Sequence, residues 1–97
     1  MAKYRLSRRA QRDMDNIADY SFDQFGREQT HRYRDGLLQM FELLANYPDM
    51  GRDYSHLRRG LRRFEHESHS IFYRKSGGDI LILRVLGQAQ LAARHLR

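Results

Sequence analysis

The sequence predicts an α+β domain in which an antiparallel helical hairpin covers one face of a small, mostly antiparallel sheet. Two observations carry this prediction. Two stretches with helical spacing of apolar residues follow one another, separated by little more than Gly26, and two runs rich in strand formers flank the pair Gly77-Gly78. A short strand before the helices and a short helix after the last strand complete the expected order.

The N-terminal segment predicts a short edge strand followed by a capped helix. Residues 3–6 alternate polar and apolar side chains, which is typical of a strand. Ser7 is a residue type that caps helix N-termini, and Gly26 ends the helix as a C′ glycine would. Apolar or small residues recur with helical spacing at Ala10, Met14, Ile17, Ala18, Ser21 and Phe25, whereas Asp13, Asp15, Asp19 and Asp23 fall largely off that face.

The second predicted helix has the stronger apolar face. The short connection at Gly26 makes the two helices antiparallel neighbours, so that their apolar faces can lie together on a sheet. Pro48 disfavours helical backbone at Tyr47 and therefore closes the helix, and residues 48–56 are rich in turn formers and predict a loop. The apolar face consists of Thr30, Tyr33, Leu37, Met40, Phe41 and Leu44.

Three strands are expected in the C-terminal third. Residues 61–67 predict the first, and the other two, at about 68–75 and 79–86, form a hairpin around Gly77-Gly78. Because the helical hairpin covers only one face of the sheet, the other face is expected to be poorly covered, which is a reason to expect a partner. The spacing of Ala89, Ala92, Ala93 and Leu96 predicts a short C-terminal helix within a single domain spanning residues 1–97.

Composition narrows the class of protein. A chain of 97 residues forms one domain with a modest core. It contains no cysteine, which excludes disulfides and thiolate zinc sites. The N-terminus has no apolar signal-like region, and no run approaches the roughly 20 apolar residues of a membrane span. We therefore expect a cytoplasmic protein.

The positive charge is carried almost entirely by arginine. The net charge is +6, with 16 arginines and 2 lysines. Because the guanidinium fork pairs well with carboxylates and phosphates, the surface either is simply solvated or binds an acidic partner, which could be a nucleic acid or an acidic protein segment. Four arginines cluster at Arg58, Arg59, Arg62 and Arg63, although Arg62 and Arg63 would point to opposite faces of a strand.

Two more arginines stand where a helix disfavours them. Arg8 and Arg9 occupy the first turn of the first predicted helix, where a positive charge opposes the helix macrodipole. Either a nearby carboxylate such as Asp13 or Asp15 compensates them, or they serve binding. The sequence leaves both accounts open.

Metal and catalytic motifs are weak. The run His66-Glu67-Ser68-His69 is one residue short of the helical zinc pattern, and on a continuous strand its two histidines would face opposite sides. We therefore expect neither a metal nor another cofactor. Acid–base cleavage of RNA would need a base, an acid and a cation near one phosphate. Suitable residue types occur at Tyr54, His56, Glu65, Arg84 and His95, which sequence alone does not bring together.

Beyond these patterns, the chain resembles the ParE toxins of the RelE/ParE superfamily of bacterial toxin–antitoxin modules. The resemblance spans nearly the whole chain and depends on an ordered set of pieces rather than on one motif. The matching pieces are Tyr4-Arg-Leu-Ser7 with Ala10 and Asp13; Ile17, Tyr20 and Phe25-Gly26; Tyr33, Leu37 and Phe41 through Leu44; Pro48, Gly51-Arg52, Leu57-Arg58 and Gly60; His69-Ser-Ile-Phe-Tyr73; and Ile82-Leu-Arg-Val-Leu86.

The resemblance implies a non-enzymatic toxin that binds DNA gyrase, blocks it and arrests growth, as part of a module that stabilises a plasmid or chromosome. It also implies a ParD-like antitoxin that forms a hetero-oligomer with the toxin and carries any contact with operator DNA, without a membrane partner. On this view we expect the target to contact Arg84, Gln88, Gln90, Leu91, Arg94 and His95. The antitoxin is expected to contact Arg58, Arg59, Arg62, Arg63, Ile71 and Tyr73.

Two alternatives stay open. RelE-like relatives cut messenger RNA on the ribosome with the same fold, and an attenuated toxin could act mainly as an antitoxin-binding module. The family often reads Arg-(Ile/Val)-Leu-His after the last strand, followed by a basic residue and Met-Asp, whereas this chain continues from Leu86 with Gly87-Gln88-Ala89. Glycine has no side chain for proton transfer, which weakens the RNA-cleaving alternative.

Overall fold

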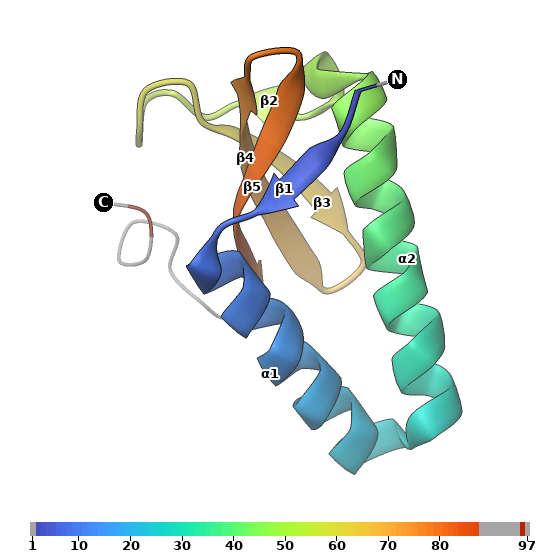
Figure 1. The fold of residues 1–97 in the computed structure, drawn as a ribbon. Helices are drawn as coiled ribbons and strands as arrows, with labels where there is room; N and C mark the ends of the chain where they lie inside the picture. The colour runs from blue at the N-terminus through green and yellow to red at the C-terminus, as the bar shows by residue number, and fades with distance from the viewer. Residues whose placement is uncertain (1, 88–95, 97) are drawn as a thin grey trace.

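Two helices pack on one face of a five-stranded sheet (Figure 1). The computed structural model describes residues 2–87 and Leu96. The predicted α+β architecture is confirmed, whereas the predicted C-terminal helix lies outside the described residues except for Leu96. The elements are β1 (Tyr4–Leu6), α1 (Arg8–Phe25), α2 (Arg27–Asn46), the 3₁₀ turn η1 (Pro48–Met50), β2 (Arg52–Asp53), β3 (Arg62–His66), β4 (His69–Ser76) and β5 (Asp79–Gly87).

The sheet has the strand order β1-β5-β4-β3-β2. β1 pairs with β5 in parallel at one edge, and every other pair is antiparallel. The predicted hairpin is confirmed: β4 and β5 join through Gly77, which has φ 63, and Gly78. β2 was not predicted, because two residues of a turn-rich segment pair with β3 only through tertiary structure.

Ser7 ties the first helix to the sheet. Its side chain accepts a hydrogen bond from the Ala10 N–H at 3.0 Å, which confirms the predicted cap. The same hydroxyl donates to the carbonyl of Leu83 at 2.8 Å. At the other end, Gly26 has φ 86 and joins α1 directly to α2. The two helices meet there and diverge toward their other ends (Figure 1).

The main core lies between the helices and the sheet. α2 contributes the buried residues Leu37, Phe41 and Leu44, which confirms its predicted face. The prediction for α1 is wrong at two positions. Phe25 is 57% exposed, because the helical junction projects beyond the sheet (Figure 1), and Asp13 is buried at 9% exposed.

The second face of the sheet is covered, which corrects the expectation of a poorly covered face. Residues 54–61 fold back over it, and the Tyr54 N–H donates to the Leu61 carbonyl at 2.9 Å. Tyr54 and Leu57 pack against a second buried cluster on this face. That cluster consists of Leu61, Phe72, Leu83, Leu86 and Leu96.

Tyr73 on β4 links the sheet to the segment that follows α2. Its side chain is fully buried, and its hydroxyl donates to the Pro48 carbonyl at 2.7 Å and accepts from the Gly51 N–H at 2.8 Å. A Cβ atom at Gly51 would lie 2.7 Å from Cε1 of Tyr73, so only glycine allows this approach. The segment after α2 is therefore held on the sheet by one buried hydroxyl.

Candidate functional site

A groove opens where α1, α2 and the β3–β4 turn come together. It has a volume of about 440 Å³ and includes the aromatic side chains of Tyr20, Phe25 and Tyr33. Tyr20 is 64% exposed and Phe25 is 57% exposed. An apolar concavity with exposed aromatic residues at its rim is typical of a binding surface. The remaining lining residues are Asp13, Asn16, Ile17, Ser21, Gln29, Glu67, Ser68, His69 and Val85.

One end of the groove is polar and internally bonded. The hydroxyl of Tyr33 lies 2.5 Å from Nδ1 of His69 and 3.3 Å from Oγ of Ser68. Burial raises the pKa of Tyr33. Burial also lowers the pKa of His69, and the nearby His66 lowers it further. The groove therefore presents a histidine whose neutral form is favoured.

The two histidines do not point in opposite directions, which corrects the sequence expectation. Glu67 and Ser68 form a turn, with Glu67 at φ 52, so that His66 and His69 become direct cross-strand partners. They therefore share one face of the hairpin. Across residues 2–87 and Leu96, no group of three or more His, Cys, Asp or Glu side chains could hold a metal ion.

Asp13 binds Arg84 beside the groove. The carboxylate accepts hydrogen bonds from Nε of Arg84 at 2.8 Å and from Nη2 at 2.9 Å. It also accepts from the backbone N–H of Val85 at 2.9 Å. The side chains of Asp13 and Arg84 are only 10% and 13% exposed, and Asp13 raises the pKa of Arg84. The Arg84 side chain is thus largely buried and paired with Asp13.

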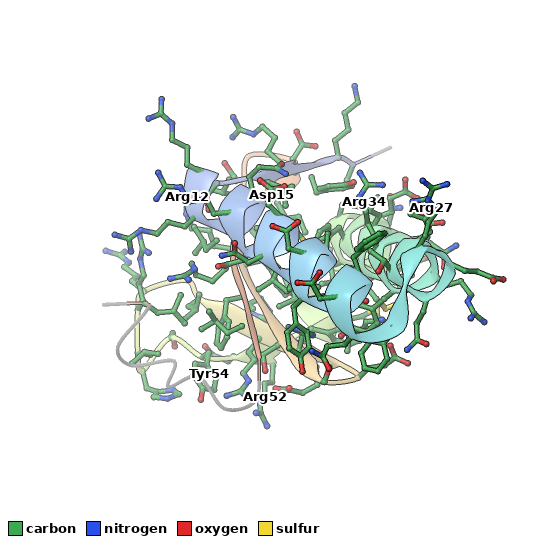
Figure 2. The ribbon with its side chains drawn as sticks, turned by 90° about the horizontal axis from the view of Figure 1, so that it is seen from below. Arg12, Asp15, Arg27, Arg34, Arg52 and Tyr54 are labelled. Carbon is green, nitrogen blue, oxygen red and sulfur yellow. The ribbon has the colours of Figure 1, made fainter. Side chains whose placement is uncertain are left out.

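Basic and aromatic side chains interleave on the second face of the sheet. The guanidinium of Arg63 lies 5.3 Å from the ring centres of both Tyr54 and Phe72. It also donates to the Tyr54 hydroxyl at 2.9 Å and forms an ion pair with Glu65. Arg52 lies beside Tyr54, at the side of the molecule away from Arg12 and Asp15 of α1 (Figure 2).

This cluster contains three of the five residues that sequence offered for acid–base chemistry. Tyr54 and His56 are in ring contact with centroids 4.5 Å apart, and Glu65 pairs with Arg63. Arg84 is directed to Asp13 instead, and His95 lies outside the described residues. The structure therefore does not assemble the five residues into one site.

Comparison with known proteins decides the family. The model of the ParE toxin of the type II toxin–antitoxin system, parDE, matches residues 4–92. The chain belongs to the ParE toxin family. Toxin ParE1 of Caulobacter vibrioides is 44% identical to it over 96 residues, covering 99% of each chain. Toxin ParE1 of Mycobacterium tuberculosis is 34% identical over 96 residues, covering 98% of each.

A solved structure shares the ParE-family fold. The chromosomal ParDE TA system from P. aeruginosa contains a chain that superimposes with a TM-score of 0.76 at 24% sequence identity. The similarity covers 90% of this chain and 96% of that one. The family resemblance and the fold class predicted from sequence are thereby confirmed. Among the described residues, no helix is long and apolar enough to cross a membrane.

The residues expected to contact a ParD-like antitoxin fall into two groups, one exposed and one bonded or buried within the fold. Arg58 and Arg59 are exposed on the loop before β3. Arg62 donates to the Gly51 carbonyl at 2.9 Å, whereas Arg63 stacks on the opposite face, as the strand geometry predicted. Ile71 and Tyr73 are both 0% exposed. The side chains of this last pair belong to the core and offer no surface for a partner.

The residues expected to contact the target are mostly outside the described part of the chain. Of that set only Arg84 is described, and it is bound to Asp13. Gly87, where the sequence departs from the family pattern, is the last residue of β5 and pairs with His69. Sequence reasoning missed the groove, because it assigned Phe25 to the core. The nearby Tyr20, an aromatic residue outside the predicted apolar face, was the one available signal that this end of α1 carries exposed aromatic side chains.

Proposed function

We propose that the chain inhibits DNA gyrase by binding it, without catalysing a reaction, and that a ParD-like antitoxin neutralises it in the cytoplasm. The groove between α1, α2 and the β3–β4 turn is the proposed antitoxin site. The observation that carries this proposal is the pair of exposed aromatic side chains, Tyr20 and Phe25, beside an apolar concavity of about 440 Å³. Such surfaces are uncommon on proteins that act alone.

The chemistry of the groove indicates the kind of antitoxin segment that fits. Ile17, Tyr20 and Phe25 supply an apolar wall along α1, which suits the apolar face of an amphipathic helix. Ser68 and His69 at the far end supply polar atoms for orienting hydrogen bonds. An antitoxin helix with large apolar residues three and four positions apart would therefore bury Tyr20 and Phe25 together.

Inhibition of gyrase without catalysis is supported by family membership and by the state of Arg84. A ribonuclease of RelE type needs cations at the scissile phosphate. In this chain Arg84 is held by Asp13, and Gly87 has no side chain that could transfer a proton. Both features favour a toxin that acts by binding.

A supercoiling assay tests the proposal. The purified chain is added to gyrase, ATP and relaxed plasmid, and we expect loss of supercoiling that an equimolar antitoxin restores. A correctly folded chain that binds the antitoxin but leaves both supercoiling and growth unchanged would support the attenuated module instead. Toeprinting on translating ribosomes tests the remaining alternative. New messenger cuts that disappear with Arg84→Ala would overturn the non-enzymatic proposal.

Target contact is proposed for the segment after β5. Truncation after Leu86 would be a poor test, because it also removes Leu96, which is buried in the second-face cluster. Alanine substitutions at Gln88, Gln90 and Arg94 avoid this problem. We expect them to weaken gyrase inhibition and to leave antitoxin binding unchanged. Leu91 and His95 complete the proposed contact set, and the exposed Arg58 and Arg59 are proposed antitoxin contacts outside the groove.

A further inference from the structure

A second concavity, of about 530 Å³, lies at the other end of α1 and is strongly basic. Its walls come from four parts of the chain: Ser7 with the start of α1, the loop before β3, β5, and Leu96. We propose that this basic hollow binds the phosphate groups of a nucleic-acid backbone. The basic hollow is defined here by Arg8, Arg9, Arg58, Arg84, Leu57 and Leu83.

The positive charge of the basic hollow is not neutralised locally. None of the described residues that line it is acidic. The charge of Arg84 is matched by Asp13, but within residues 2–87 no carboxylate lies within ion-pair distance of the exposed Arg8, Arg9 or Arg58. Three guanidinium groups from two distant segments thus face one concavity, and no described residue supplies them with a counter-charge. Bringing them together costs electrostatic free energy that a bound anion would recover.

Neither of the carboxylates that the sequence offered to compensate Arg8 and Arg9 forms an ion pair with them in the described part of the chain. Asp13 is engaged by Arg84 and by the Val85 N–H. Asp15 accepts a hydrogen bond from Gln11 at 3.2 Å. The first turn of α1 contains no acidic residue, so both arginines also oppose the helix macrodipole. The binding account therefore remains for these two residues.

The mixed lining favours a nucleic-acid backbone over a simple anion. Arg8, Arg9 and Arg58 can each form bidentate hydrogen bonds with phosphate oxygens. The half-buried Leu57 supplies apolar surface beside them, which suits the sugar of a nucleotide and offers nothing to an inorganic ion, whereas Leu83 is only 9% exposed. The net charge of +6 adds long-range attraction for a polyanion.

Exposed arginines on α2 provide matched controls. Arg27 and Arg34 are exposed, and they lie at the opposite end of the molecule from Arg12 on α1 (Figure 2). Neither lines the basic hollow. Removing Arg27 or Arg34 changes the net charge as much as removing Arg9 does. A difference between the two sets therefore reports position and not total charge.

Fluorescence anisotropy with a labelled DNA duplex of about 20 base pairs tests the inference over a series of NaCl concentrations. For the full chain we expect the logarithm of the association constant to fall linearly with the logarithm of salt concentration. Each of Arg8→Ala, Arg9→Ala and Arg58→Ala should reduce the slope by about 1 and weaken binding severalfold. Arg27→Ala and Arg34→Ala should leave the slope nearly unchanged.

Three results would overturn the inference. Equal effects of the two sets of variants would mean that binding follows net charge alone. Competition by polyglutamate as strong as by unlabelled DNA would favour an acidic protein segment as the occupant. No measurable binding of the duplex, together with binding of inorganic triphosphate measured directly by titration calorimetry, would make the hollow a site for small phosphates. The assay contains neither gyrase nor antitoxin, so its outcome is independent of the proposed function.

Discussion

Asp13 on α1 and Arg84 on β5, 71 residues apart in the chain, are joined by two hydrogen bonds of 2.8 and 2.9 Å. The pairing of β1 with β5 ends at Leu6 and Ile82, and Ser7 then donates to the Leu83 carbonyl through its side chain. Beyond that point the Asp13 carboxylate accepts the Val85 N–H at 2.9 Å. Asp13 thus provides a hydrogen-bond acceptor for the backbone of β5 beyond the point where its pairing with β1 ends.

Asp13→Asn should destabilise the fold substantially. The substitution removes the charge that matches Arg84, whose side chain is 13% exposed, and weakens the hydrogen bond to Val85. Breaking a largely buried pair from one side costs about 2–4 kcal/mol. Urea denaturation monitored by circular dichroism measures this cost. Asp15→Asn is the control, since Asp15 is exposed and among the described residues accepts only from Gln11, and it should change stability by less than about 0.5 kcal/mol.

Phe25→Asp should weaken antitoxin binding by about tenfold or more, because a charge would replace an aromatic side chain in the proposed groove. Stability should change little, since Phe25 is 57% exposed. Phe22→Asp is a close control, because Phe22 is 55% exposed on the same helix but does not line the groove. Titration calorimetry with the cognate antitoxin measures both. Equal losses for the two variants would place the antitoxin elsewhere on α1.

Stability should fall as the pH is lowered below about 6.5, in part through His69. Burial, and then His66, lower the pKa of His69 in the folded chain below its unfolded value. The unfolded chain therefore binds more protons in this window, and the contribution of His69 to stability is complete above pH 6.5 and lost as the pH falls through the folded pKa. Denaturation at pH 7.5 and 5.0 should show a smaller loss for His69→Gln than for the unaltered chain.

His31→Gln provides the comparison for the pH experiment. His31 is exposed on the same helix as Tyr33, the partner of His69, and the substitution replaces one imidazole without altering the groove. The pH dependence of this variant should match that of the unaltered chain. An unchanged pH dependence in His69→Gln would contradict the assignment to His69.

The elements that sequence predicted are those with local signals. Ser7 capped the first helix and Gly77-Gly78 closed the hairpin, because capping and glycine turns depend on neighbouring residues. The β3–β4 turn at Glu67 and Ser68 was missed, since neither is a residue type that commonly adopts positive φ, yet Glu67 has φ 52. Its geometry is set by the pairing of the strands on either side.

Long-range pairing decided the features that sequence could not give. Asp13 looked like one of several acidic residues off the apolar face, and only its distant partner Arg84 accounts for its burial. The cover of the second face depends likewise on residues 54–61 folding back, which a turn-rich composition does not reveal. The groove was missed for the same reason. Helical spacing places Phe25 on the apolar face of the helix, but it does not show that this end of the helix extends beyond the sheet.

Gly51→Ala should destabilise the fold by about 1–3 kcal/mol, because the new methyl group would lie 2.7 Å from Cε1 of the buried Tyr73. Tyr73→Phe should cost a similar amount by leaving the Gly51 N–H and the Pro48 carbonyl without their buried partner. The two substitutions disrupt one contact, so the double variant should lose less stability than the sum of the single losses. Thermal denaturation of all three measures the coupling, and strict additivity would contradict it.

Arg9→Glu should stabilise the isolated chain while weakening its binding to DNA. The substitution replaces a charge that opposes the macrodipole of α1 with one that favours it, which is worth about 0.5–1.5 kcal/mol, or a rise of roughly 3–8 °C in the melting temperature. Arg12→Glu makes the same charge change beyond the first turn, where the macrodipole effect has declined, and should raise the melting temperature less. Stabilisation at Arg9 combined with weaker DNA binding would mean that the residue is retained for its ligand at a cost to the fold. If Arg9→Glu gave no greater stabilisation than Arg12→Glu, the repulsion at the start of α1 would be absent, and the electrostatic basis of the basic hollow would fail with it.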